Sequence, residues 1–334
     1  MDLDAYVAAH RAEWQRLETL VGRASRPRRL TGAEVDEVVD LYQRVATHLS
    51  VLRSRASDPA LVARLSSLVA RARGVVAGGS RGTWNDVVRF LSADFPAVCY
   101  RTRAWWGGAA LAFVLVATAF GLWVAQNSEV QQAIGTPEEI RQLVEEDFEG
   151  YYSSAPAQDF ALRVFTNNAY VAMQSILFGA LLGLPIPYVL LQNALNVGVS
   201  GGLMAANDRL GLFFGLILPH GLLELTAVFV ACGLGLRLGW TVVDPGSRTR
   251  SAALAQEGRA LVSGALGLAV VLLVSGVIEG FVTPSGLPTA VRVGIGVLAE
   301  ALFLAYVFGP GRRAHLAGVT GDIGAERAGD ALPT

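Results

Sequence analysis

An uncharged stretch of 22 residues at positions 104–125, AWWGGAALAFVLVATAFGLWVA, constrains the fold of this chain most strongly. A helix of about 20 apolar residues crosses the roughly 30 Å of hydrocarbon in a bilayer. Trp105, Trp106 and Trp123 stand near the ends of the stretch, where indole rings favour the membrane interface. The stretch therefore predicts a transmembrane helix.

Five further apolar runs follow, so the sequence predicts an all-α polytopic membrane helix bundle of about six spans. The predicted spans are about 104–125, 168–184, 186–206, 210–236, 260–282 and 287–308. Only 16% of the residues are charged, whereas soluble domains carry roughly 25%. Pro185 and Pro187 separate the second and third spans, which leaves open whether these two are thin spans or a re-entrant pair.

Residues 1–103 predict a cytoplasmic helical domain that ends in an interfacial helix. Their apolar residues recur at helical spacing, Thr31 and Glu34 form a capping-box pattern, and Asp58 followed by Pro59 is typical of a helix start. The first 14 residues are charged and have no apolar core, so we expect no cleavable signal peptide. The transmembrane bundle then covers 104–309, and 310–334 form a flexible cytoplasmic tail.

Arginine bias predicts the orientation. Residues 1–103 hold 16 Arg against 11 acidic residues, whereas the 126–163 loop holds eight acidic residues against two Arg. Because cytoplasmic segments carry the excess of basic residues, we expect a multi-pass protein of the cell membrane with both termini in the cytoplasm. The acidic loop then lies outside.

His220 and Glu224 interrupt the fourth predicted span, in LPHGLLEL. An ionisable side chain in the bilayer centre costs roughly 2.5–3.5 kcal/mol on insertion scales, and residues four apart share one face of a helix. Pro219 tends to kink that helix, and Gly221 permits close approach of another helix. The pair is predicted to be either a functional group, such as a proton relay, gate or substrate anchor, or a polar clamp between helices.

Further polar side chains lie within the predicted spans and join the candidate motif. They are Glu279, Glu300, Asn167, Asn168 and Asn193. Carboxylates at membrane depth face the bundle interior, a cavity or a partner. We expect the asparagines or Glu279 to meet His220 and Glu224. Arg292 either extends to the outer membrane interface or pairs with Glu279, and we expect the pair.

No motif of an enzyme or of a cofactor site is present, so we predict a non-enzymatic protein with no catalytic residues and no cofactor. The pattern H-x-x-x-E differs from the zinc motif H-E-x-x-H, and no third ligand is evident, so no metal site is predicted. The two cysteines, Cys99 and Cys232, form no cluster. The dispersed arginines of residues 1–103 fit anionic lipid heads better than nucleic acid.

Taken together, these motifs resemble the stage II sporulation protein M family of multipass membrane proteins. The stretch LPHGLLELTAVFVACGLGLRLG at 218–239 resembles the family's central motif, in which His220, Gly221 and Glu224 match. FTNNAYVAMQSILFGALLGLP, LQNALNVGVSGG and VSGVIEGFVTPSGLP follow the family's pattern in the same order. Through them, Asn167, Asn168, Asn193 and Glu279 are weaker matches.

The resemblance implies a membrane-embedded component or scaffold of a cell-envelope complex, because the founding member sits with peptidoglycan-degrading enzymes. It also implies partners beyond the lipid bilayer, such as RDD-type membrane proteins or a MoxR-type ATPase system, and leaves an oligomer open. The alternative is a transporter or channel-like protein with a polar path through His220, Glu224 and Glu279. A water-open cavity at these side chains would favour the alternative.

Overall fold

The computed structural model describes residues 3–24, 30–55, 58–76, 84–150 and 157–322. Helices make up nearly all of this part, and no strand occurs within it. The chain divides into two compact units between Asn85 and Asp86. Residues 86–103, expected as the end of the N-terminal domain, thus belong to the second unit, where α5 packs against α13 and α15.

The N-terminal unit is a bundle of α1 (Leu3–Ala24), α2 (Gly32–Arg55) and α3 (Pro59–Val76). Leucine and valine side chains from all three helices fill its core, among them Leu17, Val45 and Leu65. The predicted capping box is confirmed, since the Thr31 backbone N–H donates to Glu34 (2.8 Å) and the Glu34 N–H to the Thr31 hydroxyl (3.4 Å). Asp58 caps α3 as predicted.

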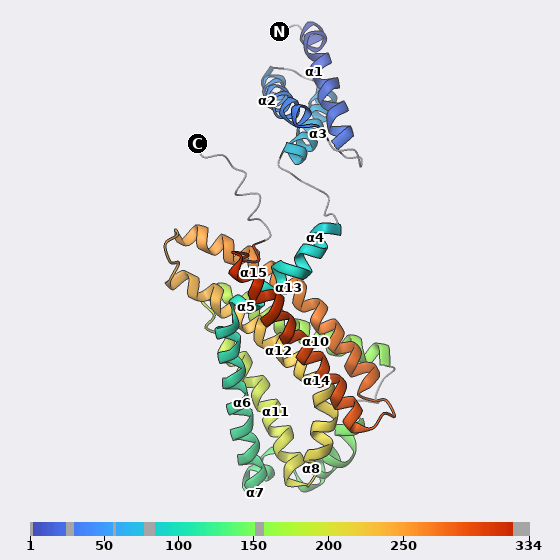
Figure 1. Cartoon of the computed structure of the whole chain (residues 1–334), viewed down its shortest axis with the longest axis vertical. Coiled ribbons are helices and arrows are strands. Elements are labelled where there is room, and N and C mark those ends of the chain that lie inside the picture. The colour runs from blue at the N-terminus through green and yellow to red at the C-terminus, as the bar shows by residue number, and fades with distance from the viewer. Residues whose placement is uncertain (1–2, 25–29, 56–57, 77–83, 151–156, 323–334) are drawn as a thin grey trace. The chain divides into compact units, whose positions relative to one another are not determined.

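The second unit is the membrane bundle (Figure 1). Its long helices are α6 (Arg103–Gln126), α10 (Ala157–Phe178), α11 (Ile186–Ala206), α12 (Leu210–Val243), α13 (Arg250–Val277) and α14 (Thr289–Tyr306). Shorter helices are α4 (Trp84–Arg89), α5 (Phe95–Arg101), α7 (Ser128–Ile134), α8 (Pro137–Gln142), α9 (Phe148–Gly150) and α15 (Arg312–Leu316). Single π-helical turns lie at Phe90–Asp94, Leu143–Asp147, Ile278–Val282 and Val307–Gly311, and a 3₁₀ turn at Gly179–Leu181.

Five helical segments of the described part are long and apolar enough to cross a membrane: Arg103–Gln126, Ile186–Ala206, Leu210–Val243, Arg250–Val282 and Thr289–Leu316. They confirm an all-α polytopic bundle. The second predicted span, 168–184, is different. Its helix, α10, starts at Ala157 and ends at Phe178, because the chain turns through Leu182 and Gly183 at positive φ (58° and 73°) before Pro185.

Although less apolar, α10 runs the height of the bundle beside α12. Val164 packs with Leu216, Ser175 with Gly235, and Leu182 with Gly239, so the two helices are parallel. In contrast, Gly233 of α12 packs on Trp106, and Phe229 on Phe113, so α12 and α6 are antiparallel. The chain therefore needs α10 as a return pass between α6 and α11, which themselves run parallel.

The two ends of the membrane bundle lie together. Gly321 approaches Val98 and Asp94, and Arg259 forms a bidentate ion pair with Asp322 (2.6 and 2.7 Å). The predicted flexible tail therefore begins later than residue 310, because these contacts and α15 hold the chain as far as Asp322. Residues 323–334 of that predicted tail lie outside the described residues.

Candidate functional site

His220, Glu224 and Glu279 form one polar cluster inside the membrane bundle. One nitrogen of His220 and one oxygen of each carboxylate lie within 4.8 Å of one another. The Nε2 atom of His220 is 3.6 Å from Oε1 of Glu279, and these side chains expose only 7% and 4% of their surface. The structure thus joins the i, i+4 pair of α12 to a carboxylate beyond the end of α13.

Two hydroxyl groups complete the polar cluster. Ser275 Oγ contacts Glu224 Oε2 at 3.4 Å and donates to the backbone carbonyl of His220 at 3.1 Å. Thr283 Oγ1 lies 3.2 Å from Nδ1 of His220. The sequence interpretation missed both residues, although Ser275, Glu279 and Thr283 repeat the four-residue spacing of His220 and Glu224 and thus share one helical face.

Local backbone features position the polar cluster. Pro219 lies inside α12, and the backbone there packs so closely on Gly296 of α14 that a Cβ atom at Gly296 would lie 2.5 Å from the Pro219 carbonyl oxygen. Glu279 lies in the π-helical turn Ile278–Val282. Such turns insert one extra residue into a helix and occur frequently at functional sites. The π turn carries Glu279 and Thr283 together toward His220.

Arg292 does not pair with Glu279, contrary to the prediction. Its guanidinium donates to the Thr283 carbonyl and to the Thr289 hydroxyl, 3.1 Å away. These acceptors lie at the turn between the π turn and α14, close to Arg292 along the chain. Glu279 Oε2, in contrast, is buried and has no hydrogen-bond partner. The polar cluster therefore holds two carboxylates and no arginine.

The remaining predicted site residues lie outside the polar cluster. Glu300 of α14 accepts from the Thr226 hydroxyl at 2.9 Å. The amides of Asn168 and Asn193 donate to carbonyls one turn earlier in their own helices, at 3.2 and 2.8 Å. Asn167 is exposed on α10, and Gly221 is buried in α12. The asparagines are thus not the partners of His220 and Glu224.

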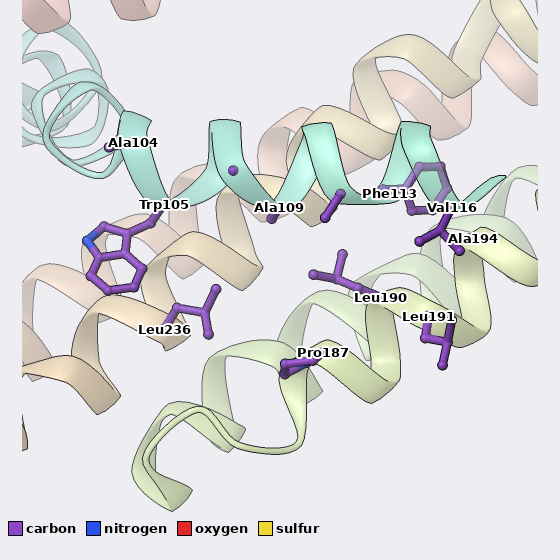
Figure 2. Close-up of a pocket in the computed structure, with 12 residues that line it drawn as sticks. Ala104, Trp105, Ala109, Phe113, Val116, Pro187, Leu190, Leu191, Ala194 and Leu236 are labelled. Atoms are coloured by element: carbon purple, nitrogen blue, oxygen red, sulfur yellow. The ribbon is translucent and has the colours of Figure 1, made fainter. Parts of the chain in front are cut away.

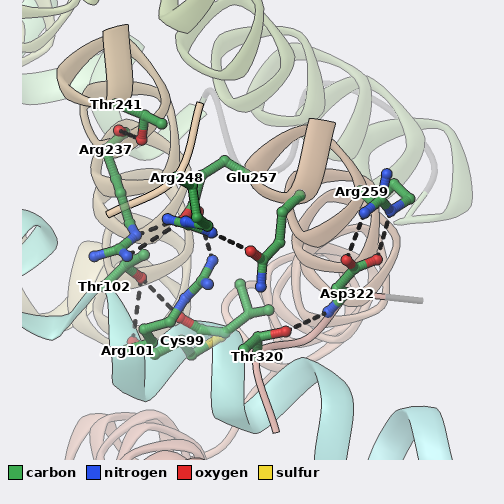
Figure 3. Close-up of polar contacts among 12 residues, drawn as sticks. Cys99, Arg101, Thr102, Arg237, Thr241, Arg248, Glu257, Arg259, Thr320 and Asp322 are labelled. Carbon is green, nitrogen blue, oxygen red and sulfur yellow. Dashed lines mark hydrogen bonds and ion pairs between the residues drawn. The ribbon is translucent and has the colours of Figure 1, made fainter. Parts of the chain in front are cut away.

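A second charged group, which the sequence interpretation also missed, joins α5, α12 and α13 (Figure 3). Glu257 accepts from Arg101 at 2.6 Å and from Arg237 at 3.2 Å. The side chains of Arg101 and Glu257 expose 8% and 4% of their surface. Burial lowers the pKa of Arg101, and the charge of Glu257 opposes that shift. This arginine–glutamate triad fastens three segments at one end of the bundle.

An apolar groove of about 520 Å³ separates parts of α6 and α11 (Figure 2). Trp105, Phe113, Leu190 and Leu236 are among its lining residues. The groove presents no ionisable side chain, so its chemistry differs from that of the polar cluster.

One other group of side chains in the described residues has the composition of a metal site. His10, Glu13 and His48 of the N-terminal unit also bring ligand atoms within 4.8 Å of one another. The rings of His10 and His48 are tilted by 33° with centroids 3.9 Å apart, and Trp14 Nε1 donates to His48 Nδ1 at 3.3 Å. His48 Nδ1 is therefore already engaged with Trp14.

Comparison with known proteins gives two matches to protein families. The family described as Stage II sporulation protein M matches residues 110–284, and a domain of unknown function (DUF8413) matches residues 4–78. No curated protein and no solved structure matches the chain. The first match begins within α6, ends just after Thr283 and contains the whole polar cluster.

Proposed function

Because the chain belongs to the stage II sporulation protein M family, we propose that it is a non-enzymatic integral membrane component, or scaffold, of a cell-envelope complex. In this proposal the membrane bundle anchors the complex and the N-terminal unit binds partner proteins. Other membrane or envelope proteins are the expected partners, with RDD-type proteins and a MoxR-type ATPase system as the first candidates.

The observation that carries the proposal is the way the polar cluster fastens helices. His220 and Glu279 are buried, and Ser275 and Thr283 link α13 and the turn after it to α12. Hydrogen bonds of this kind hold membrane helices together, contributing about 0.6 kcal/mol each on average in one measured bundle. A fixed bundle of this sort suits an anchoring role.

Affinity purification of the tagged chain from native membranes tests the scaffold. Wild-type protein should recover a defined set of membrane or envelope proteins. A His220→Ala variant, which removes the link between α12 and Thr283, should recover less of that set or accumulate less. Glu300→Gln, which alters a carboxylate outside the polar cluster, serves as the matched control and should recover the wild-type set.

Transport is the second candidate, because Glu279 Oε2 and Glu300 Oε2 are both buried without a hydrogen-bond partner. Such oxygens suit a proton pathway. The two functions differ in one measurement, proton flux into proteoliposomes that contain the purified chain and a pH-sensitive dye. Full complex recovery by Glu279→Gln together with lost flux would support transport and contradict the scaffold.

The proposal includes the cell membrane as location and both ends of the bundle in the cytoplasm. The arginine-rich N-terminal unit and the acidic 126–163 loop support this orientation, and the alternating directions of α6, α10, α11 and α12 agree with it. Cys99 and Cys232 are buried and free, so single cysteines can be introduced on the native background. Cysteine at Ser247 should react with an impermeant maleimide only after cell lysis, whereas cysteine at Ser128 should react in intact cells.

A further inference from the structure

The polar cluster has the donor set of a metal site. An imidazole nitrogen and two carboxylate oxygens, from His220, Glu224 and Glu279, lie within 4.8 Å of one another. An ion bound at about 2.0–2.2 Å from each donor holds its donors roughly 3.3 Å apart in a tetrahedral arrangement. The His220–Glu279 separation of 3.6 Å is near that value, and a rotation of the less buried Glu224 side chain supplies the rest.

A cation would also balance the charge that the polar cluster carries when both of its carboxylates are ionised. Two ionised carboxylates in a bundle core repel each other and lose their hydration, at a cost of several kcal/mol per ion in real proteins. Arg292 is engaged elsewhere. A divalent cation between Glu224, Glu279 and a neutral imidazole gives a site with no net charge. Such a site is compatible with membrane depth.

One of the three candidate ligands also carries an unpartnered oxygen. Glu279 exposes only 4% of its side chain, yet its Oε2 atom has no hydrogen-bond partner. Buried polar atoms in native structures are nearly always satisfied, and an exception points to an absent ion or water. Oε1 of the same carboxylate faces His220. An ion bound between His220 and Glu279 would therefore neutralise a carboxylate whose other oxygen the protein leaves without a partner.

The surroundings orient the ligands as in known metal sites. Metal-ligating histidines usually donate from the other ring nitrogen to a neighbouring oxygen, which fixes the ring. His220 has this arrangement, with Nδ1 at Thr283 Oγ1 (3.2 Å) and Nε2 toward Glu279 (3.6 Å). Ser275 likewise contacts the ligand candidate Glu224. The side chains around the three donors therefore support metal coordination.

From this geometry we propose that His220, Glu224 and Glu279 bind one divalent transition-metal ion, Zn²⁺ or Mn²⁺. One imidazole with two carboxylates suits these ions better than Mg²⁺ or Ca²⁺, which favour oxygen ligands alone. The third ligand that the α12 motif lacks in sequence is Glu279, 55 residues after Glu224. The site does not depend on the scaffold proposal, since binding can be measured on the isolated chain.

The test uses the full chain, purified in detergent with a tag free of histidine. All variants carry His48→Gln, so that the N-terminal group of His10, Glu13 and His48 does not contribute. The protein is stripped with a chelator, desalted, incubated with Zn²⁺, Mn²⁺ or Co²⁺, and desalted again. Metal content is measured by mass spectrometry, and Co²⁺ coordination by visible absorption.

We expect about one ion per chain and a Co²⁺ ligand-field spectrum. Glu279→Gln and His220→Gln should weaken binding at least tenfold and abolish that spectrum. Glu300→Gln, which removes a carboxylate of the same bundle outside the polar cluster, should leave the bound metal and the Co²⁺ spectrum unchanged. Equal binding by Glu279→Gln and the parent, or no retained ion in the parent, would overturn the proposal.

A ligand-exchange variant guards against misfolding as the cause of lost binding. His220→Cys retains a ligand at position 220, and its thiolate should give a sulfur-to-cobalt charge-transfer band that the parent lacks. The appearance of that band identifies residue 220 as a ligand. Monodisperse, folded His220→Cys protein that binds Co²⁺ without the band would refute the assignment.

Discussion

Gly235→Ala tests the contact that makes α10 a pass of the bundle. A Cβ atom at Gly235 would lie 2.2 Å from the Ser175 carbonyl oxygen of α10, whereas ordinary contact begins at 3.4 Å, so the two helices must separate by about 1.2 Å there. The Ser175 carbonyl oxygen belongs to the backbone of α10, so it cannot rotate away as a side chain could. Ile186 Cδ1, 2.8 Å from the same Cβ position, blocks a second direction.

Overpacking of this kind costs about 1–3 kcal/mol, and the backbone obstacle places Gly235→Ala at the upper end. For a domain of roughly this size, 1 kcal/mol lowers Tm by about 2–4 °C, so we expect a decrease of about 6–12 °C. The assay is a thermal melt of the full chain in detergent at a fixed scan rate, followed by circular dichroism.

Gly294→Ala is the matched control, because it lies inside α14 and a Cβ atom there meets nothing within 4 Å. Alanine in a helix interior is favoured over glycine by up to about 1 kcal/mol, so Gly294→Ala should melt at or slightly above the wild-type temperature. If Gly235→Ala melts together with Gly294→Ala, then α10 does not pack on α12 as described.

Three further predictions follow from contacts described above. Glu257→Gln leaves Arg101 buried without its carboxylate and should destabilise the bundle by about 3–5 kcal/mol. The control Glu138→Gln changes an exposed pair with Arg141 and should alter stability by less than about 0.5 kcal/mol. Chemical denaturation compares the two variants, and equal unfolding midpoints would contradict the triad. Burial and the neighbouring His10 lower the pKa of His48 from 6.5, so the folded N-terminal unit disfavours protonation. The stability of this unit should be highest above pH 6.5 and should decline as the pH falls through the lowered pKa. Hydrogen exchange of α1–α3 measures this dependence on pH, which should be weaker in His48→Gln. Burial also raises the pKa of Cys99, so this thiol should stay unalkylated at pH 8 in folded protein and react on unfolding, as mass spectrometry of the alkylated chain will show.

Much of the fold followed from local signals in the sequence. Apolar runs and the positions of proline predicted most of the helices, and the capping patterns at Thr31 and Asp58 predicted two helix starts. The extent of α10 did not follow, because Arg163, Asn167 and Asn168 lower its hydropathy, and because its place in the bundle depends on backbone contact with Gly235 and Gly239. In the sequence, the only sign of such contact between distant segments is the glycine itself.

The site was predictable in part. The cost of burying ions singled out His220, Glu224 and Glu279, and the structure places them together. The partners of each group depend on register between helices, which a single sequence does not specify. The π turn that carries Glu279 toward His220, and the triad of Arg101, Arg237 and Glu257, arise from such tertiary packing. The amides of Asn168 and Asn193 donate to backbone carbonyls of their own helices. Helical spacing alone does not exclude this alternative to a contact with His220 and Glu224.

The arrangement of the polar cluster has a consequence for biogenesis. Its candidate ligands come from α12 and from the π turn that follows α13, and only residues 244–249 join α12 to α13. Each helix alone presents ionisable groups to lipid at a cost of a few kcal/mol, but as an antiparallel hairpin the two helices shield those groups from hydrocarbon. Insertion of α12 and α13 as one hairpin is therefore energetically favoured over stepwise release.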